Sequence, residues 1–222
     1  MRSTAIAPGS PVAIPAGAVT LEGNLVVPVD AGGIVLFAHG SGSSSQSPRN
    51  RLVAARLHQQ HLGTLLIDLL APDEEAVDAF TGHLRFDIEL LANRLLAATD
   101  WLERSPETRD LNIGYFGAST GAAAALVAAA GRPEIGAVVS RGGRPDLAGP
   151  ALDRVKAPTL LIVGGADLPV IGMNSDALAQ LRTEKKLAIV PGATHLFEEP
   201  GALDEVARLA GQWFAAYITR SA

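Results

Sequence analysis

The segment GYFGASTGAAAALVAAAG, residues 114–131, sets a single serine, Ser119, among glycines and alanines. The residues that lead into it, LNIGYF, are mostly apolar, as expected for a strand inside a protein. The residues that follow Ser119 are rich in alanine, which favours a helix. Gly117 and Gly121 flank the serine at equal spacing. The segment therefore predicts a buried strand, a tight turn that carries Ser119, and a helix.

This segment alone leaves two interpretations of Ser119 open. Serine is a common N-cap residue, and small residues let a helix pack closely on a sheet. Alternatively, Gly-x-Ser-x-Gly between a strand and a helix is typical of a strained turn that presents a nucleophilic serine, where nearby side chains would clash. The helix N-terminus would also favour negative charge that develops beside Ser119. We favour the nucleophile, because the strand–turn–helix context is what that role requires.

Apolar runs and amphipathic segments alternate along the rest of the chain. Continuous apolar runs predict strands buried on both faces, and apolar residues at three-and-four spacing predict helices. The opening segment, residues 11–30, predicts a hairpin at an edge of the sheet, with its turn at EGN, residues 22–24. We expect the other strands within residues 33–40, 64–71, 111–117, 135–143, 157–165 and 185–192, and helices within 48–63, 85–105, 119–131, 174–182 and 203–218.

This alternation predicts the fold class. Strands that alternate with helices indicate right-handed crossovers and a mostly parallel sheet, of about eight strands here, with helices on both faces. A chain of 222 residues can bury one full core, so we expect a single α/β domain over residues 1–222. The short connections leave no room for a large cap domain. In such sheets ligands bind at the carboxyl ends of the strands, so the residues just after each strand become the candidates for function.

Two residues that follow predicted strands form a chemical set with Ser119. Asp167 ends the segment LLIVGGAD, and His195 lies in VPGATHLF. The chain order serine, acid, histidine, with each residue at the end of a strand, matches one lineage of catalytic triads. In a triad the histidine takes the proton of the serine, and the acid orients the imidazole and stabilises its charged form. Asp146 is the alternative acid; we favour Asp167 because it follows its strand directly.

A candidate oxyanion hole follows the strand within residues 33–40. The segment FAHGSGSS ends this strand in His39 and continues with small residues. Its backbone can supply an N–H group across from the nucleophile, and we expect the N–H groups of Ser41 and Thr120 to be the two donors. His39 is interpreted as a structural residue that braces this loop.

These motifs resemble those of the α/β-hydrolase superfamily and, within it, of the small dienelactone-hydrolase-like group that lacks a cap. The resemblance covers nearly the whole chain: the opening hairpin, HGSGSS, GASTG, VGGAD and GATH follow in family order. It implies Ser119 as nucleophile, Asp167 as acid, His195 as base, and Ser41 and Thr120 as oxyanion donors.

The chain also departs from the family pattern. Dienelactone hydrolases proper use a cysteine nucleophile, and this chain has no cysteine, which favours a serine esterase or thioesterase. The segments SPRN and SRGGRPDLAG resemble a branch that is sometimes fused to phosphoribosyltransferases, for which this chain is too short.

Composition and charge argue against several classes of partner. With a net charge of −5, the chain has no basic excess for nucleic acid or for an anionic membrane surface. The longest apolar run, AAAALVAAA, is far shorter than the ~20 residues that span a bilayer. The N-terminal residues lack the pattern of a signal peptide, so we expect a cytoplasmic protein. The absence of cysteine excludes disulfides and thiolate chemistry.

No cofactor is expected. His58 and His61 share a predicted helix but lack a third metal ligand, so no metal site is predicted. The glycines around Ser119 are spaced wrongly for a dinucleotide fingerprint, and the chain has no Walker A pattern. Asp68 ends a strand without an obvious partner and is interpreted as structural, and His83 lies in a loop without an assigned role.

Arg141 follows the apolar run GAVVS at the edge of the sheet where the pocket is expected. One interpretation is that it pairs with Asp146 or Asp167 and braces the loop RGGRP. The other is that its planar guanidinium binds a substrate carboxylate or phosphate, with Arg49 and Arg51 as a second positive wall near the same opening. An arginine at such a position is costly unless it is paired.

The sequence thus predicts a serine hydrolase that cleaves small carboxylic esters or thioesters, with a small-molecule ester as its partner. An acyltransferase or perhydrolase with the same triad is the nearest alternative, since only the acceptor differs. A non-catalytic binding protein on a hydrolase fold is the alternative from another class, because fold alone does not fix function. The sequence makes no prediction about the oligomeric state.

Overall fold

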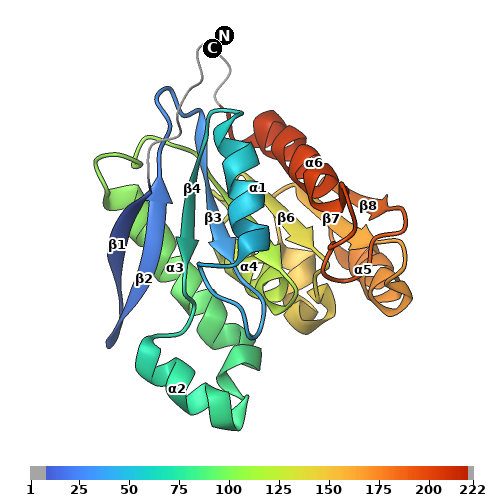
Figure 1. The fold of residues 1–222 in the computed structure, drawn as a ribbon, viewed down its shortest axis with the longest axis horizontal. Coiled ribbons are helices and arrows are strands. Elements are labelled where there is room, and N and C mark those ends of the chain that lie inside the picture. Colours follow the sequence, from blue (N-terminus) through green and yellow to red (C-terminus); the bar gives the residue numbers. More distant parts are fainter. Residues whose placement is uncertain (1–8, 220–222) are drawn as a thin grey trace.

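The computed structural model describes residues 9–219, which form one sheet of eight strands in the order β1-β2-β4-β3-β5-β6-β7-β8 (Figure 1). β1 pairs antiparallel with β2, and β2 pairs antiparallel with β4. All other neighbouring strands run parallel. The prediction of an eight-stranded, mostly parallel sheet is confirmed. The strands are β1 Ser10–Ala16, β2 Val19–Val26, β3 Gly33–Ala38, β4 Leu62–Ile67, β5 Ile113–Ala118, β6 Ala137–Arg141, β7 Thr159–Gly164 and β8 Lys185–Val190.

Helices cover both faces of this sheet. α1 (Pro48–His58) and α6 (Ala202–Tyr217) pack against each other on the face nearest the viewer in Figure 1. The opposite face is covered by α3 (Ile88–Arg104), α4 (Thr120–Gly131) and α5 (Leu168–Gln180). Every residue of β3 to β7 is buried as a result, which explains the continuous apolar runs in the sequence. None of the described helices is long and apolar enough to cross a bilayer.

Between β4 and α3 the structure contains two elements that the sequence analysis missed. These are α2 (Pro72–Thr81) and the 3-10 helix η1 (Leu84–Phe86). α2 begins with a proline and three acidic residues, a favourable start for a helix, and ends at Gly82 in the left-handed conformation. Its only buried residue is Asp78, so it has no apolar stripe by which a sequence pattern could reveal it. Within the described residues, α2 and η1 form a small projection rather than a large cap.

Three other expectations need correction. The hairpin turn lies at Gly17, which has a positive φ of 69°, whereas EGN lies inside β2. α5 begins at Leu168, earlier than the predicted segment 174–182, because its first turns expose apolar residues and lack an amphipathic pattern. A further 3-10 segment, η2 (Pro145–Arg154), follows β6 and was not predicted.

The turn between β5 and α4 has no space for side chains beside Ser119. A Cβ atom at Gly117 would overlap the backbone of Ala122. A Cβ atom at Gly121 would overlap the carbonyl oxygen of Ala38 on β3. The two glycines of Gly-x-Ser-x-Gly are therefore required by backbone contacts, which turn the chain sharply and seat α4 on the sheet.

We predict that Gly121→Ala lowers the free energy of unfolding by roughly 1–3 kcal/mol, since the added methyl group displaces packed backbone. Gly131→Ala is the matched control, because a Cβ atom at this exposed end of α4 meets no atom within 4 Å. It should leave stability unchanged or raise it slightly. Urea unfolding of both variants tests the prediction, and equal effects at the two glycines would contradict it.

Candidate active site

Ser119 occupies a strained turn at the carboxyl edge of the sheet. Its φ of 51° and ψ of −121° place a residue with a side chain in a region that normally belongs to glycine. The neighbouring strand holds this conformation: the Ser119 N–H donates to the Arg141 carbonyl oxygen at 3.2 Å. The N–H of Arg144 donates in turn to the Ser119 carbonyl oxygen at 3.1 Å. The backbone of Ser119 is thus fixed by the end of β6 and by the loop that follows it. Ser119 is also the N-cap of α4, but its hydroxyl makes no capping hydrogen bond, so the N-cap interpretation does not explain its side chain.

Asp167 and His195 are hydrogen-bonded to each other. Asp167 immediately precedes α5, and His195 lies in the loop after β8. The His195 Nδ1 atom is 2.7 Å from Asp167 Oδ2, so Nδ1–H donates to the carboxylate. The Asp167 side chain is 14% exposed and that of His195 39% exposed, so the acid is sheltered and the imidazole reaches solvent. This tautomer leaves Nε2 as the ring nitrogen that can accept a proton.

The alternative acid, Asp146, is engaged elsewhere. Its carboxylate accepts hydrogen bonds from Arg144 Nε at 2.9 Å and Nη2 at 2.7 Å. This hydrogen bonding holds the pKa of Asp146 below its ordinary value. Of the two candidate acids, the structure brings only Asp167 to His195.

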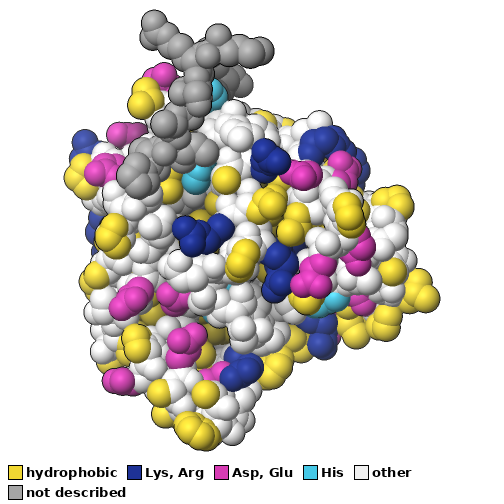
Figure 2. All heavy atoms as spheres, viewed as in Figure 1, with side chains coloured by type: hydrophobic (Ala, Val, Ile, Leu, Met, Phe, Trp, Pro, Cys, Tyr) yellow, Lys and Arg dark blue, Asp and Glu magenta, His cyan; other side chains and the backbone are white. Residues whose placement is uncertain are grey.

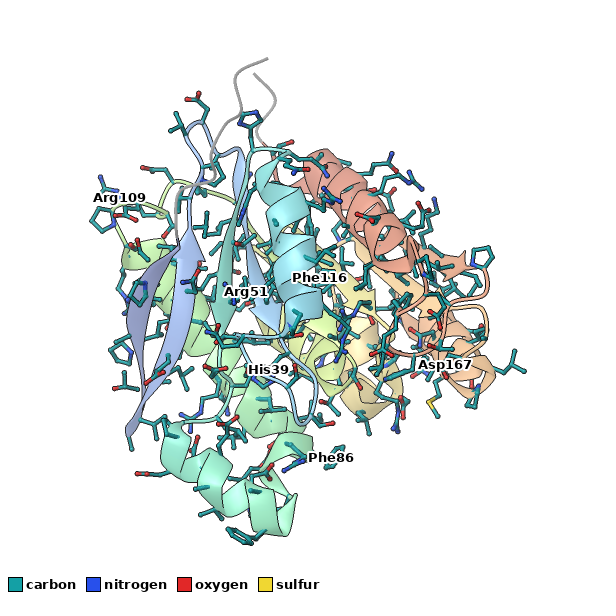
Figure 3. The ribbon with its side chains drawn as sticks, viewed as in Figure 1. His39, Arg51, Phe86, Arg109, Phe116 and Asp167 are labelled. Carbon is teal, nitrogen blue, oxygen red and sulfur yellow. The ribbon has the colours of Figure 1, made fainter. Side chains whose placement is uncertain are left out.

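The end of β6 and the residue that follows it contact both Ser119 and His195. Arg141 holds the Ser119 amide, and a Cβ atom on the next residue, Gly142, would lie 3.6 Å from His195 Cε1. On the other side, a Cβ atom at Gly40 would lie 3.0 Å from Ser119 Cβ. The three residues predicted as a triad therefore lie at one edge of the sheet. Figure 3 labels His39 below α1 and Asp167 beside α5 along this edge.

The two predicted oxyanion donors lie next to each other, with a contact that the sequence did not suggest. The Ser41 N–H donates to the side-chain hydroxyl of Thr120 at 2.9 Å. This bond fixes the β3–α1 loop against the start of α4. The same N–H would have to turn from the Thr120 hydroxyl to an oxyanion for Ser41 to act as a donor, so its role stays a prediction.

Two side chains brace this loop. His39 Nδ1 lies 2.9 Å from the Gly40 carbonyl oxygen, and His39 Nε2 accepts from the Leu69 N–H at 3.0 Å. Burial lowers the pKa of His39, in keeping with a neutral ring. Asp68 accepts hydrogen bonds from the N–H of Ser45 at 2.6 Å and from its hydroxyl at 2.9 Å. Both residues tie the β3–α1 loop to the end of β4, as their structural interpretation expects.

A cavity of about 850 Å³ opens beside the candidate oxyanion donors. Ser41 and Thr120 line one wall, and Arg49 of α1 lines another. α2 and η1 close the far side with Asp78 and Arg85, whose side chains form an ion pair. Figure 3 shows Phe86 on this projecting segment. The sequence analysis missed Asp78, Arg85 and Phe86, because none of them directly follows a strand.

Potential metal ligands do not gather in the part of the chain that the structure describes, where no group of three His, Asp or Glu side chains could hold an ion. His58 Nε2 lies 2.7 Å from the Thr64 hydroxyl, and burial lowers the pKa of His58 to about 4. His83 Nδ1 lies 2.8 Å from the Thr81 hydroxyl, at an exposed position.

The structure does not support the interpretation that Arg141 braces the RGGRP loop by pairing with Asp146 or Asp167. The two acids proposed as its partners, Asp146 and Asp167, are bound to Arg144 and His195. Arg49 is paired weakly with Glu198, at 3.4 Å. The structure thus removes the expected partners of Arg141 and leaves its guanidinium close to another positive charge.

The model of the dienelactone hydrolase family matches residues 52–217 of this sequence. The chain belongs to the dienelactone hydrolase family. It is similar to a crystal structure of a dienelactone hydrolase from Anabaena variabilis, with 66% identity, a TM-score of 0.93, and coverage of 95% of this chain and 98% of that one. Est1E from Butyrivibrio proteoclasticus shares the fold at 16% identity and a TM-score of 0.77, with coverage of 93% and 98%.

A longer relative comes from Mycobacterium tuberculosis. The protein called "Putative phosphoribosyl transferase Rv0571c" is 56% identical over 208 residues. The match covers 93% of this chain but 46% of that protein, so the chain spans less than half the length of this relative.

If Asp167 orients His195, Asp167→Asn should lower kcat for a reactive ester by roughly 10⁴-fold, because an amide holds the wrong imidazole tautomer. Asp146→Asn is the matched control and should change kcat by less than about threefold, since this carboxylate contacts Arg144 rather than the histidine. Steady-state kinetics of both variants decide the matter, and a larger loss in Asp146→Asn would show that the acid was assigned to the wrong strand.

Proposed function

We propose that this member of the dienelactone hydrolase family is a serine hydrolase of small carboxylic esters or thioesters. The observation that carries the proposal is the hydrogen bond between His195 Nδ1 and Asp167 Oδ2, which leaves Nε2 free to act as a base at the edge where Ser119 lies. The strained backbone of Ser119 supports it, since strain of this kind collects at functional sites.

The reaction would begin at the Ser119 hydroxyl. His195 Nε2 takes the hydroxyl proton while Oγ attacks the carbonyl carbon of the ester, and the carbonyl oxygen becomes an oxyanion. The N–H groups of Ser41 and Thr120 stabilise that charge, aided by the N-terminus of α4. Asp167 holds the imidazolium that forms.

The second half of the reaction returns the enzyme to its starting state. The imidazolium gives its proton to the departing alcohol or thiol, and an acyl-enzyme on Ser119 remains. Water then donates a proton to His195 and attacks the acyl carbon; the collapse that follows releases the acid and restores the Ser119 hydroxyl. The cavity beside Ser41 and Thr120 has room for a small ester.

Transfer to another acceptor uses the same residues and is the second candidate within this class. Adding an alcohol or hydrogen peroxide to a hydrolysis assay separates the two, because a transferase diverts the acyl group from water to the acceptor. We assign no phosphoribosyl transfer to this chain, because it matches less than half of the relative that carries that name.

We predict one covalent adduct when the protein reacts with a fluorophosphonate, and peptide mapping should place it on Ser119. Ser119→Ala should abolish the adduct and lower kcat by roughly 10⁴-fold or more, since only binding and the oxyanion hole remain. Ser175→Ala, which removes an exposed serine of α5, is the control and should keep both.

p-Nitrophenyl esters of graded chain length provide the accompanying activity measurement. We expect short acyl chains to be favoured. Ester turnover without an adduct on Ser119 would overturn the nucleophile. Failure of both the adduct and turnover in a folded protein would favour the non-catalytic binding protein.

A further inference from the structure

The side chain of Arg141 leaves the sheet on the face covered by α1 and α6. Ala137 and Val139, which precede it at intervals of two in β6, pack in the core cluster that contains Val53 of α1. Side chains alternate between the two faces of a strand, so Arg141 shares the face of Ala137 and Val139. Its guanidinium therefore lies on the face covered by α1 and α6, near enough to Arg49 of α1 for the two charges to interact.

Arg141 is 8% exposed, and its guanidinium has no partner in the part of the chain that the structure describes. Its Nη1 atom is buried without a hydrogen bond, and its side chain forms no ion pair with any described residue. Burial, and then the charge of Arg49, lower the pKa of Arg141 to about 10, which still leaves it positively charged at neutral pH. A buried, unpaired guanidinium is destabilising. Packing alone does not account for its presence.

Arg49 adds a second positive charge and does not neutralise the charge of Arg141. It lies in the first turn of α1, and its Nε atom is also buried without a hydrogen bond. Among residues 9–219, it forms one ion pair, with Glu198, whose side chain is 65% exposed, at 3.4 Å. Such an exposed, long contact is weak. Figure 2 shows positive, negative and histidine side chains close together between the lower end of α1 and α5.

The N-terminus of α1 strengthens this positive region. Ser47 caps the helix, and the first turn contains no acidic residue. A helix N-terminus favours anions through its free N–H groups and its dipole. Two guanidinium groups and a helix N-terminus together exceed the charge of one carboxylate, whereas a phosphate dianion would neutralise both arginines.

The region adjoins the predicted nucleophile and base. The Arg141 carbonyl oxygen accepts the Ser119 N–H, and the following residue, Gly142, packs against His195. Arg49 also lines the cavity beside Ser41 and Thr120. An anionic group held by Arg141 and Arg49 would thus belong to the same molecule as the ester bond that reaches Ser119.

We propose that Arg141 and Arg49 bind a phosphate monoester group, so that the preferred substrates of this enzyme are small esters that carry a phosphate. The inference rests on the proposed serine hydrolase activity. Arg141 is a binding residue in this account: its planar fork holds two phosphate oxygens, and Arg49 holds a third from the side of α1.

The kinetic test compares three acyl esters of equal size, whose alcohol carries a phosphate, a carboxylate or a neutral group. We expect kcat/KM for the phosphate ester to exceed that for the neutral ester by roughly 10- to 150-fold, the range for charge-assisted hydrogen bonds. Arg141→Gln should bring this ratio near one. Arg51→Gln is the matched control and should keep the ratio, because this exposed arginine of the same helix bonds Gln46 and, unlike Arg49, does not line the cavity.

A binding test is independent of turnover. Inorganic phosphate should raise the melting temperature of Ser119→Ala, and the combined Ser119→Ala, Arg141→Gln variant should lose this shift. Arg49→Gln, at a more exposed position, should weaken phosphate binding and serves in place of Arg141→Gln if that variant does not fold.

The outcomes separate this inference from the proposed function. Ser119-dependent hydrolysis with no preference for phosphate, or with an equal preference for carboxylate, would overturn the phosphate site and leave the hydrolase standing. Arg141-dependent phosphate binding without any ester turnover would support the phosphate site and overturn the proposed hydrolase. Equal losses for all three esters in Arg141→Gln, with a lower melting temperature, would assign Arg141 to folding and overturn the proposal.

Discussion

The lack of space around Ser119 is the constraint on which the rest of the site depends. Backbone atoms of β3 and α4 fill the positions where side chains of Gly117 and Gly121 would stand, and Ser119 takes a positive φ between them. Its amide is held by the Arg141 carbonyl oxygen on β6. The predicted nucleophile is therefore positioned by β3, α4 and β6. Functional side chains on rigid elements of a fold are positioned more precisely than side chains on loops.

Much of the fold could be predicted from the sequence because its signals are local. Strands buried on both faces need continuous apolar runs, and the glycine spacing around Ser119 follows from backbone contacts. The residues that follow strands in a parallel sheet meet at one edge, so Ser119, Asp167 and His195 could be grouped from chain order alone. The structure then joins Asp167 to His195 by a hydrogen bond, while their roles in catalysis stay a prediction.

Other features depend on contacts that no local pattern encodes. α2 is attached to the domain by polar contacts, among them the ion pair of Glu74 with Arg94, and so lacks the apolar periodicity that reveals a helix. The bond from Ser41 to the Thr120 hydroxyl joins residues far apart in sequence. Whether Arg141 has a partner depends on which carboxylates are already bound to other residues. The sequence left open whether Arg141 braces a loop or binds a substrate anion, and only the contacts of the nearby carboxylates could separate these two roles.

Arg141 stays unpaired within the described residues although the chain contains more acidic than basic residues. The sequence holds 23 Asp and Glu against 18 Lys and Arg, so carboxylates are plentiful. Yet the two acids expected to pair with it, Asp146 and Asp167, bind Arg144 and His195. Burying a charge without its counter-ion lowers stability, and functional sites are where real proteins break such local rules. A ligand that brings the missing negative charge would remove that cost when it binds, so the same groups that weaken the free protein would select its substrate.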